Sequence, residues 1–298
     1  AEYGYGIASA VDARRSALLS RAKGAAADPA TPAAVATALN AWIAAAADAV
    51  QSEQLGEALV QAIGDNPATP LLRSIAADAD LLGKKSIWAI GGDGWAYDIG
   101  FAGLDHVLAQ NIDINLLVMD TECYSNTGGQ MSKATPLSAV MKYAADGKRT
   151  YKKDLGRMMM TYGTVYVASI ALGADYQQAI TAMKEAEEYP GPSIVIAYCP
   201  CIAHGIRAGM SHTIVEEKEA VRSGYWPLYR YDPRRATAGL DPLQVDMPAP
   251  DGKLIGFING EDRYADLKMV DPHEASLLQP ELERRAYSIY TCLLYTSD

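Results

Sequence analysis

The stretch WAIGGDGWAYDIGFAGLDHVL, residues 88–108, begins as an apolar run, turns at a Gly-Gly-Asp-Gly sequence and continues with helical periodicity. An apolar strand, a glycine-rich turn and a helix are the parts from which α/β folds are assembled. The glycines allow a tight turn and a close approach of the backbone to a ligand. The aspartate in the turn, Asp93, is unexpected, because the free N–H groups where a helix starts attract anions and a carboxylate would repel them.

Three further apolar segments have the length and the β-branched content of buried strands. With the first strand they occupy residues 86–90, 114–120, 164–170 and 193–199. Helical segments separate the first strand from the second and the third from the fourth. This alternation predicts an α/β fold, a doubly wound and mostly parallel sheet with helices on both faces. Because ligands bind beyond the carboxyl ends of such strands, the candidate binding regions are the loops after Ile90, Asp120 and Cys199.

We place this α/β core at residues 84–212. The regions on either side of it differ from the core in composition and in sequence pattern. Residues 1–83 predict Ala-rich helices with an apolar face at 3.6-residue spacing. After residue 205 the pattern of strands and helices weakens, and residues 213–298 predict an irregular C-terminal arm. The chain opens without an initiator methionine, so we expect it to be a fragment of a longer protein.

The composition argues against some classes of function. Thirty-six acidic residues against 26 basic ones give the 298-residue chain a net charge of −10, which argues against general binding of nucleic acid or anionic membranes. No apolar run reaches the roughly 18 residues of a membrane span, and the N-terminus AEYGYG lacks the basic-then-apolar order of a signal peptide, so a cytoplasmic location is expected. Four cysteines are too few for a disulfide scaffold, which favours a metal or redox role for any cysteine with a special function.

A divalent cation would explain Asp93. The carboxylate would hold Mg²⁺ or Ca²⁺, and the metal would hold a diphosphate at the start of the helix. The next loop, DTECYSNTGGQ at residues 120–130, offers the hydroxyl of Thr121 and further oxygen donors, so two neighbouring strand ends could complete one octahedral shell. Two simpler interpretations stay open: Asp93 caps the helix, or residues 120–130 form a polar loop without a ligand.

These two loops carry a resemblance to a known family. GDGWAYDIG followed by DTECYSNTGGQMSKATP resembles the thiamine diphosphate signature, a GDG with a downstream Asn, in the form typical of pyruvate:ferredoxin (flavodoxin) oxidoreductases. The resemblance continues through PGPSIVIAYCPCIAHG and SGYWPLYRYDPR, and it covers most of the chain. It implies the C-terminal thiamine diphosphate-binding domain of an enzyme that converts pyruvate to acetyl-coenzyme A and CO₂ and passes electrons through 4Fe–4S clusters to ferredoxin or flavodoxin.

The resemblance also implies roles for individual residues. Asp93, Thr121 and the backbone carbonyl of Cys123 correspond to Mg²⁺ ligands. Asn126 corresponds to the residue that contacts pyruvate, and an amide there can donate a hydrogen bond to a developing alkoxide. The residues that correspond to the lining of the cofactor are Gly92, Asp93, Gly94, Trp95, Thr121, Glu122, Cys123, Tyr124, Ser125 and Asn126.

The loop after the fourth strand, AYCPCIAHG, carries two cysteines. In the family one cysteine of this loop is the fourth ligand of a 4Fe–4S cluster, and alignment on PCI puts that role on Cys201. Cys199 is then a core residue or a neighbour of the cluster ligands, and the other three cluster ligands lie outside this chain. His204 lies near the expected cluster and could tune it through a hydrogen bond, although a packed histidine is the simpler interpretation.

By the same resemblance, the rest of the active site belongs to other domains of the enzyme. An N-terminal domain supplies the glutamate that activates the aminopyrimidine ring of thiamine, so we expect this chain to be inactive alone. The expected partners of the full enzyme, a homodimer, are pyruvate, coenzyme A and ferredoxin or flavodoxin. The last residues, YTCLLYTSD, depart from the family pattern and are doubtful.

One basic run has two interpretations, a solvated face or a contact surface for coenzyme A or an acidic ferredoxin. It consists of Lys142, Lys148, Arg149, Lys152, Lys153 and Arg157.

Three interpretations of the function stay open. The leading one is the cofactor-binding domain of a pyruvate:ferredoxin oxidoreductase, which the loop of Cys201 supports. The second is another 2-oxoacid oxidoreductase or a non-oxidative thiamine-dependent decarboxylase; the GDG chemistry is shared, and a decarboxylase has no need of Cys201. The third is a metal-dependent binding module without catalysis of its own.

Overall fold

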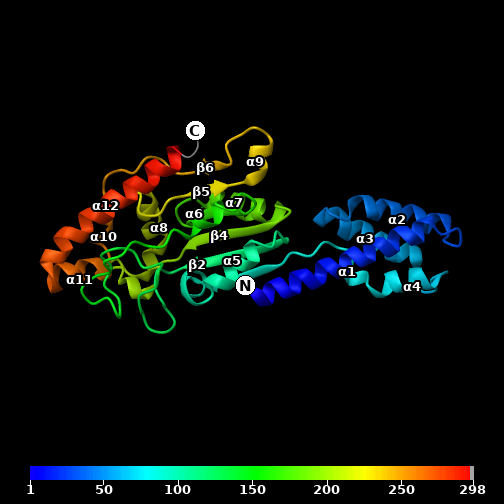
Figure 1. Ribbon diagram of the computed structural model, residues 1–298, viewed down its shortest axis with the longest axis horizontal. Helices are drawn as coiled ribbons and strands as arrows, with labels where there is room; N and C mark the ends of the chain where they lie inside the picture. Colours follow the sequence, from blue (N-terminus) through cyan, green and yellow to red (C-terminus); the bar gives the residue numbers. More distant parts are fainter. Residues whose placement is uncertain (296–298) are drawn as a thin grey trace. The chain divides into compact units, whose positions relative to one another are not determined.

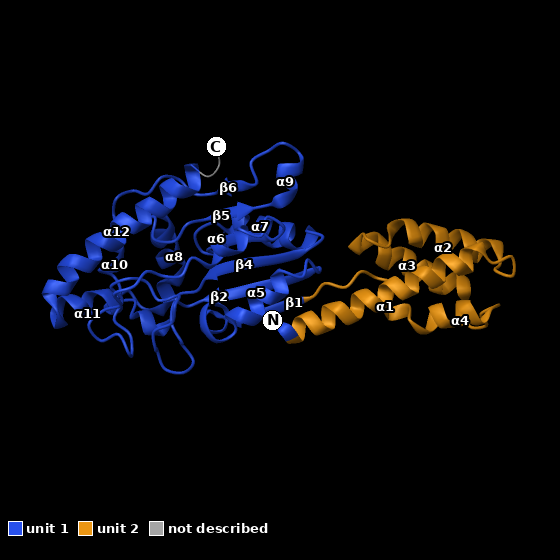
Figure 2. Cartoon of the chain, viewed as in Figure 1, with its two compact units in different colours: residues 1–2, 88–298 blue, residues 3–87 orange. Residues whose placement is uncertain are grey.

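The computed structural model describes residues 1–295. Its contacts divide the described chain into two compact units, residues 3–87 and residue 88 onward together with residues 1–2 (Figure 2). The tail that the sequence marks as doubtful is helical as far as Tyr295, and its residues 296–298 lie outside the described residues.

The unit of residues 3–87 is built from helices. They are α1 (Glu2–Ala27), α2 (Ala33–Ala45), α3 (Ala49–Ile63), α4 (Pro70–Ala77) and a short 3₁₀-helix (Ala79–Leu81). Asp48 and Thr69 cap α3 and α4, because each side chain accepts a hydrogen bond from a backbone N–H at the start of its helix. Leu39, Trp42 and Leu59 belong to the buried core of this unit. The Ala-rich helices that the sequence predicts here are therefore present.

A six-stranded sheet forms the centre of the other unit (Figure 1). Its strands are β1 (Trp88–Gly92), β2 (Ile114–Asp120), β3 (Tyr166–Ile170), β4 (Pro192–Tyr198), β5 (Tyr229–Tyr231) and β6 (Leu243–Val245). They lie in the order β1-β2-β4-β3-β5-β6; β1 to β4 are parallel, and β5 and β6 are antiparallel to their neighbours. The predicted mostly parallel α/β sheet is confirmed, and most residues of its central strands β2 and β4 are buried, as their continuous apolar runs indicate.

Helices cover both faces of this sheet. On one face, α7 (Tyr176–Glu188) packs its alanines against β3 and β4, where Val195 lies. On the opposite face, Gly156 of α6 (Leu155–Met160) lies against Ile196, whose side chain points away from that of Val195. The connection from β1 to β2 contains a π-helical turn (Gly94–Ile99) followed by α5 (Phe101–Leu108).

The C-terminal segment is more regular than the irregular arm predicted for residues 213–298. Besides β5 and β6 it contains α8 (Thr213–Arg222), α9 (Pro233–Thr237), α10 (Leu254–Ile258), α11 (Asp262–Val270) and α12 (Pro272–Tyr295). That part of the prediction was wrong. β5 and β6 have three residues each and α9 and α10 five each, too few to show a period in the sequence, and the longer helices α8, α11 and α12 were missed. β5 and β6 extend the sheet beyond β3, so the segment is part of the central architecture.

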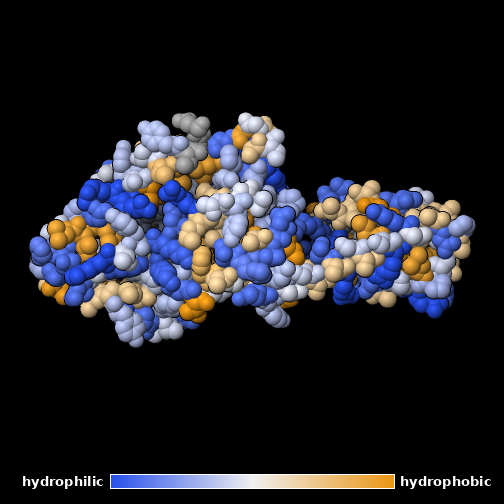
Figure 3. Space-filling view, in the orientation of Figure 1, coloured by the Kyte–Doolittle hydropathy of each residue, from blue (hydrophilic) through white to orange (hydrophobic). Residues whose placement is uncertain are grey.

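The surface of the molecule is mixed in character. On the face drawn in Figure 3, hydrophobic residues occur in separate small groups among hydrophilic ones, which is usual for proteins in water. Within residues 1–295, no helix combines the length and the apolar character that crossing a bilayer requires.

Candidate cofactor site at the ends of three strands

The loops after β1, β2 and β4 meet at one edge of the sheet. β1 pairs in parallel with β2, so that Gly92 lies beside Met119, and β2 pairs in parallel with β4, so that Asp120 lies beside Tyr198. The strand order therefore brings together the three loops that the sequence indicates one by one.

Asp93 is the centre of a hydrogen-bonded cluster that joins the first two loops. Its Oδ1 accepts hydrogen bonds from Thr121 Oγ1 at 2.8 Å and Thr121 N at 3.3 Å, and its Oδ2 accepts one from Ser132 Oγ at 2.7 Å. Thr121 Oγ1 also lies 3.1 Å from the carbonyl oxygen of Cys123. The structure thus gathers the carboxylate, hydroxyl and carbonyl that the sequence singles out, and it adds Ser132, which sequence reasoning missed.

The charge of Asp93 lies in an unfavourable environment. The residue is 1% exposed, and burial, together with the nearby charge of Asp120, raises the pKa of Asp93 to about 6 despite the two hydroxyl hydrogen bonds. Burial also raises the pKa of Asp120, although Lys152 Nζ lies 2.8 Å from Asp120 Oδ2. The hydrogen-bond partners of Asp93 are hydroxyls and an amide, which do not neutralise its charge. A cation bound at Asp93 would therefore be stabilised.

Glycine serves a different structural purpose at each of the three positions of the turn. A Cβ built on Gly91 would lie 2.4 Å from the Trp95 ring, and one built on Gly94 would lie 2.3 Å from the Tyr124 ring. At Gly92 the nearest atom would be a backbone oxygen 4.0 Å away, and the residue is exposed. Gly92 therefore leaves space for a ligand beside the backbone, whereas Gly91 and Gly94 make room for aromatic rings.

We expect alanine substitutions at Gly92 and Gly94 to have different effects on stability. Gly94→Ala should lower the free energy of unfolding by roughly 1–3 kcal/mol, because its methyl group collides with the Tyr124 ring. Gly92→Ala should change it by less than about 0.5 kcal/mol, because its methyl group meets open space. Denaturant unfolding of both variants and the wild type measures the difference. Equal losses in the two variants would contradict this account of the turn.

The second loop makes a tight turn directly after Thr121 and Cys123. Tyr124 N donates a hydrogen bond to Gln130 O at 2.9 Å, and the chain turns between these two residues. Ser125 and Trp95 are half-buried, and Asn126 is exposed at this turn. The amide of Asn126 is therefore accessible to a small molecule.

The carboxylate of Glu122 is directed to other charges of the interior. Glu122 is 1% exposed; Lys152 Nζ lies 2.9 Å from its Oε1, Arg263 Nη2 lies 2.9 Å from its Oε2, and Tyr225 OH donates a hydrogen bond to Oε2 at 2.5 Å. Although burial opposes it, the charges of Lys152 and Arg263 lower the pKa of Glu122 to about 2. Because these partners occupy the carboxylate, the side chain of Glu122 is not available to a ligand at the Asp93 cluster.

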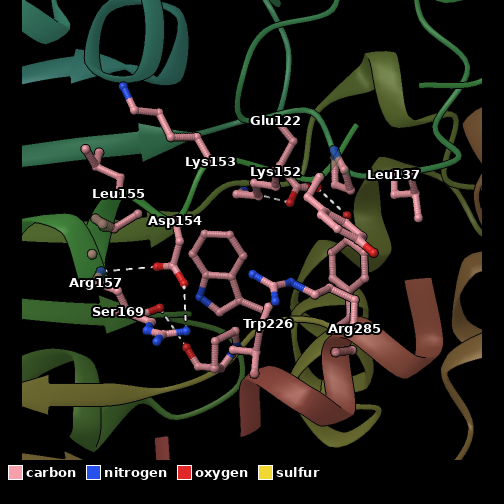
Figure 4. Close-up of a pocket in the computed structure, with 18 of the residues that line it drawn as sticks. Glu122, Leu137, Lys152, Lys153, Asp154, Leu155, Arg157, Ser169, Trp226 and Arg285 are labelled. Carbon is pink, nitrogen blue, oxygen red and sulfur yellow. Dashed lines mark hydrogen bonds and ion pairs between the residues drawn. The ribbon is translucent and has the colours of Figure 1, made fainter. Parts of the chain in front are cut away.

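Glu122 also lines a cavity of about 120 Å³, together with Lys152, Trp226 and Arg285 (Figure 4). Neither Asp93 nor Thr121 is part of its lining. The walls are mostly apolar, and several of them come from the C-terminal helix α12. This cavity is therefore separate from the Asp93 cluster.

The third loop brings Cys201 next to the second. Cys201 is 8% exposed and packs with Cys123 and Met141, and Ala203 N donates a hydrogen bond to its Sγ at 3.4 Å. Burial raises the pKa of both Cys123 and Cys199 to about 12. These two thiols are therefore protonated at neutral pH, which agrees with packing roles for their side chains.

His204 is a packed histidine that contacts the second loop. It is fully buried, its Nε2 lies 2.8 Å from the carbonyl oxygen of Thr121, and its Nδ1 lies 3.6 Å from Glu261 Oε1. Glu261 in turn accepts a hydrogen bond from Arg263 Nε at 2.7 Å. Sequence reasoning missed Glu261 and Arg263, because His204 and Thr121 are already 83 residues apart and nothing local marks the acidic and basic partners beyond them.

Part of the basic run turns inward. Lys148 is 6% exposed, and its Nζ donates hydrogen bonds to the carbonyl oxygens of Ser132 at 3.1 Å and Thr135 at 2.5 Å. Burial lowers the pKa of Lys148 to about 8. Lys148 therefore supports the turn that holds Ser132 against Asp93, and the interpretation of the whole run as a solvated face is wrong at Lys148 and Lys152.

The donors around Asp93 fit a hard divalent cation. Mg²⁺ takes oxygen ligands and keeps several positions for water and phosphate, and Asp93, Thr121 and Cys123 offer three oxygens of different kinds. Structural zinc sites instead combine several histidine and cysteine side chains. No group of three or more such side chains that could hold a metal occurs in the described part of the chain.

The chain is similar to known thiamine pyrophosphate enzymes. The family described as "Thiamine pyrophosphate enzyme, C-terminal TPP binding domain" matches residues 74–197. Pyruvate:ferredoxin oxidoreductase of Moorella thermoacetica is 49% identical over 294 residues, which are 96% of this chain and 25% of that protein. Pyruvate-flavodoxin oxidoreductase of Klebsiella pneumoniae is 48% identical over 250 residues, which are 84% of this chain and 21% of that protein.

A third relative differs in the electron acceptor that its name gives. The mitochondrial pyruvate dehydrogenase (NADP(+)) of Euglena gracilis is 44% identical over 286 residues, which are 95% of this chain and 16% of that protein. A solved 2-oxoglutarate:ferredoxin oxidoreductase from Magnetococcus marinus aligns over 51% of this chain and 46% of its own, with a TM-score of 0.37 and 21% identity. The chain spans a quarter or less of the length of these curated relatives.

Proposed function

Since the chain belongs to the family of the pyruvate:ferredoxin and pyruvate-flavodoxin oxidoreductases, we propose that it holds the diphosphate end of thiamine diphosphate through Mg²⁺ and serves the oxidative decarboxylation of pyruvate to acetyl-coenzyme A and CO₂. The observation that carries the proposal is the buried carboxylate of Asp93, 2.8 Å from Thr121 Oγ1 and without a neutralising hydrogen-bond partner. None of the hydrogen-bond partners of this carboxylate is a cation, and Mg²⁺ bound with a diphosphate would supply one.

Three residues of the chain would hold the metal: Asp93 through Oδ1, Thr121 through its hydroxyl, and Cys123 through its backbone carbonyl. When bound, thiamine diphosphate supplies an electron sink for cleaving the bond between the keto carbon and the carboxylate of the substrate. Ser132 keeps the other oxygen of Asp93 in place by its hydrogen bond of 2.7 Å. Gly92 leaves the backbone open where the diphosphate approaches.

The loop after the metal ligands would act on the substrate. The exposed amide of Asn126 is free to donate a hydrogen bond to the oxygen of the keto group as negative charge develops on it. Around it, the other residues that would line the cofactor are Gly94, Trp95, Tyr124 and Ser125, with Glu122 contributing its backbone.

In the same proposal Cys201 is one ligand of a 4Fe–4S cluster whose other ligands lie outside this chain. Its position in the third loop, beside Cys123 of the second, would bring the cluster close to the cofactor. The N–H of Ala203, which donates to Cys201 Sγ, would stabilise the thiolate of the bound state.

The partners of the proposed enzyme are pyruvate, coenzyme A and an electron carrier. The names of the relatives differ in the acceptor, which is ferredoxin, flavodoxin or NADP(+). We assign the cofactor to a core at residues 84–212, with residues 1–83 and 213–298 as flanking parts. A homodimeric enzyme in the cytoplasm is part of the same proposal.

We expect this chain to bind thiamine diphosphate in a Mg²⁺-dependent manner. The metal bridges the diphosphate to Asp93, so titration calorimetry should show binding in the presence of Mg²⁺ and none in EDTA. Thiamine without its diphosphate is the matched control and should not bind. Binding of equal strength in EDTA, or no binding in Mg²⁺, would contradict the proposal.

A further inference from the structure

Glu122 combines two features that are unusual in a loop residue, a left-handed backbone and a buried acidic side chain. Its φ is +57°, in a region that residues other than glycine rarely adopt. Its side chain is 1% exposed. Three other non-glycine residues of the described chain have positive φ, but Glu122 is the one that lies between two proposed metal ligands, Thr121 and Cys123.

Every hydrogen-bonding group of Glu122 has a partner. Its N–H donates to Asp120 Oδ1 at 3.0 Å, and its carbonyl accepts from Thr135 Oγ1 at 2.6 Å. Its carboxylate is held by Lys152 from one side and by Arg263 from the other, each at 2.9 Å, with the hydroxyl of a tyrosine as a third partner. A residue held at its backbone and at its side chain cannot relax without breaking several charged contacts.

The backbone of Glu122 decides where its two neighbours point. Thr121 Oγ1 lies 2.8 Å from Asp93 Oδ1 and 3.1 Å from the carbonyl oxygen of Cys123. The peptide units on both sides of Glu122 join these groups. A change of φ to the right-handed or extended region would rotate these units and separate the Cys123 carbonyl from the Thr121 hydroxyl.

We propose that the buried ion pairs of Glu122 hold its backbone in the left-handed conformation and thereby keep the Thr121 hydroxyl and the Cys123 carbonyl directed at the metal that Asp93 binds. The inference rests on the proposed function, because it concerns the affinity for Mg²⁺. Glu122 acts through its neighbours and is therefore a positioning residue. Its ion pairs with Lys152 and Arg263 link the metal site to residues far along the sequence.

Two substitutions separate positioning from a merely structural role. Glu122→Ala and Glu122→Gly both remove the carboxylate, but glycine adopts positive φ without strain and alanine does not. The measurement is the apparent Kd for Mg²⁺ at a fixed concentration of thiamine diphosphate, by titration calorimetry of the chain. The free energy of unfolding is measured in parallel. We expect Glu122→Ala to raise this Kd roughly 10- to 100-fold, as other positioning residues of metal sites do, and Glu122→Gly to recover most of the loss.

The outcomes distinguish this inference from the proposed function. If the wild type binds with Mg²⁺ and the two variants have the same Kd as each other, the positioning role is overturned while the metal site stands. If the wild type shows no dependence on Mg²⁺, the proposed function itself fails. Should the variants not fold, Tyr225→Phe removes one hydrogen bond to the Glu122 carboxylate and is expected to raise the Kd to a smaller extent. An unchanged Kd in Tyr225→Phe would then overturn the inference.

Discussion

Replacing Asp93 with asparagine is expected to stabilise the cofactor-free chain and at the same time to abolish its Mg²⁺-dependent binding of thiamine diphosphate. The stabilisation follows from the pKa of Asp93, which burial raises from 3.8 to about 6. A buried carboxylate with a raised pKa binds its proton more tightly in the folded than in the unfolded chain, so its ionisation destabilises the fold. A neutral amide of the same shape avoids the free-energy cost of ionising Asp93 in the folded chain. At pH values above 6 this cost is roughly 3 kcal/mol.

The raised pKa of Asp93 also determines how its effect on the free energy of unfolding should change with pH. The contribution of Asp93 to the free energy of unfolding should fall as pH rises from about 4 to about 6, the interval between its unfolded and folded pKa values, and stay low above it. The difference in free energy of unfolding between Asp93→Asn and the wild type should therefore grow through this interval. Denaturant unfolding at several pH values, without Mg²⁺, measures it. Saturating Mg²⁺ and thiamine diphosphate should reverse the order, because they bind the wild type alone.

The loss of binding in Asp93→Asn should be large. Removing a metal ligand is expected to weaken the Mg²⁺-dependent binding at least about 100-fold, the upper end of what positioning residues of metal sites show. Asp105→Asn is the matched control, because Asp105 lies on the helix after the turn and accepts a hydrogen bond from Tyr162 OH, outside the cluster. It should leave binding unchanged. A variant Asp93→Asn that binds as well as the wild type would remove Asp93 from the site.

The second large effect is expected from Lys152→Met, which should lower the free energy of unfolding by roughly 3–5 kcal/mol. Lys152 Nζ lies 2.8 Å from Asp120 and 2.9 Å from Glu122, and both acids are fully buried. Methionine fills a similar volume but leaves two carboxylates in the interior without their shared cation. The chain should regain part of the loss in acid, where these carboxylates are protonated.

Lys133→Met is the control for this second experiment. The side chain of Lys133 is 63% exposed, and its ion pair with Asp98 spans 3.3 Å at the surface. Such a pair contributes about 0–1 kcal/mol, so the substitution should have little effect. Thermal or denaturant unfolding of both variants provides the comparison. If the two losses were equal, the buried charges around Glu122 would not stabilise the fold as described here.

The strands and the position of the site could be predicted from the sequence, for a physical reason. Parallel strands buried on both faces read as continuous apolar runs, and the runs of β2 and β4 lie within one residue of the observed strands. Because ligands gather at the carboxyl ends of such strands, Asp93 and Thr121 could be placed at one edge before their hydrogen bond was seen.

The residues that surround the site could not be predicted from the sequence in the same way. Ser132, Arg263 and Glu261 reach the loops through tertiary packing, and no periodicity or local motif marks them. The inward turn of Lys148 also depends on packing, since a basic run in a sequence does not reveal which members meet buried carbonyls. The left-handed backbone of Glu122 is a further example, because nothing in the sequence around an acidic residue predicts positive φ.

The most direct test of the central claim, that Asp93 holds a metal that holds a diphosphate, is anomalous X-ray diffraction. Crystals of the chain grown with thiamine diphosphate and Mn²⁺ in place of Mg²⁺ would locate the ion by its anomalous signal. The account predicts one peak within roughly 2.5 Å of Asp93 Oδ1, Thr121 Oγ1 and the Cys123 carbonyl oxygen, next to the two phosphates. A bound diphosphate with the ion elsewhere, or with none at Asp93, would contradict it.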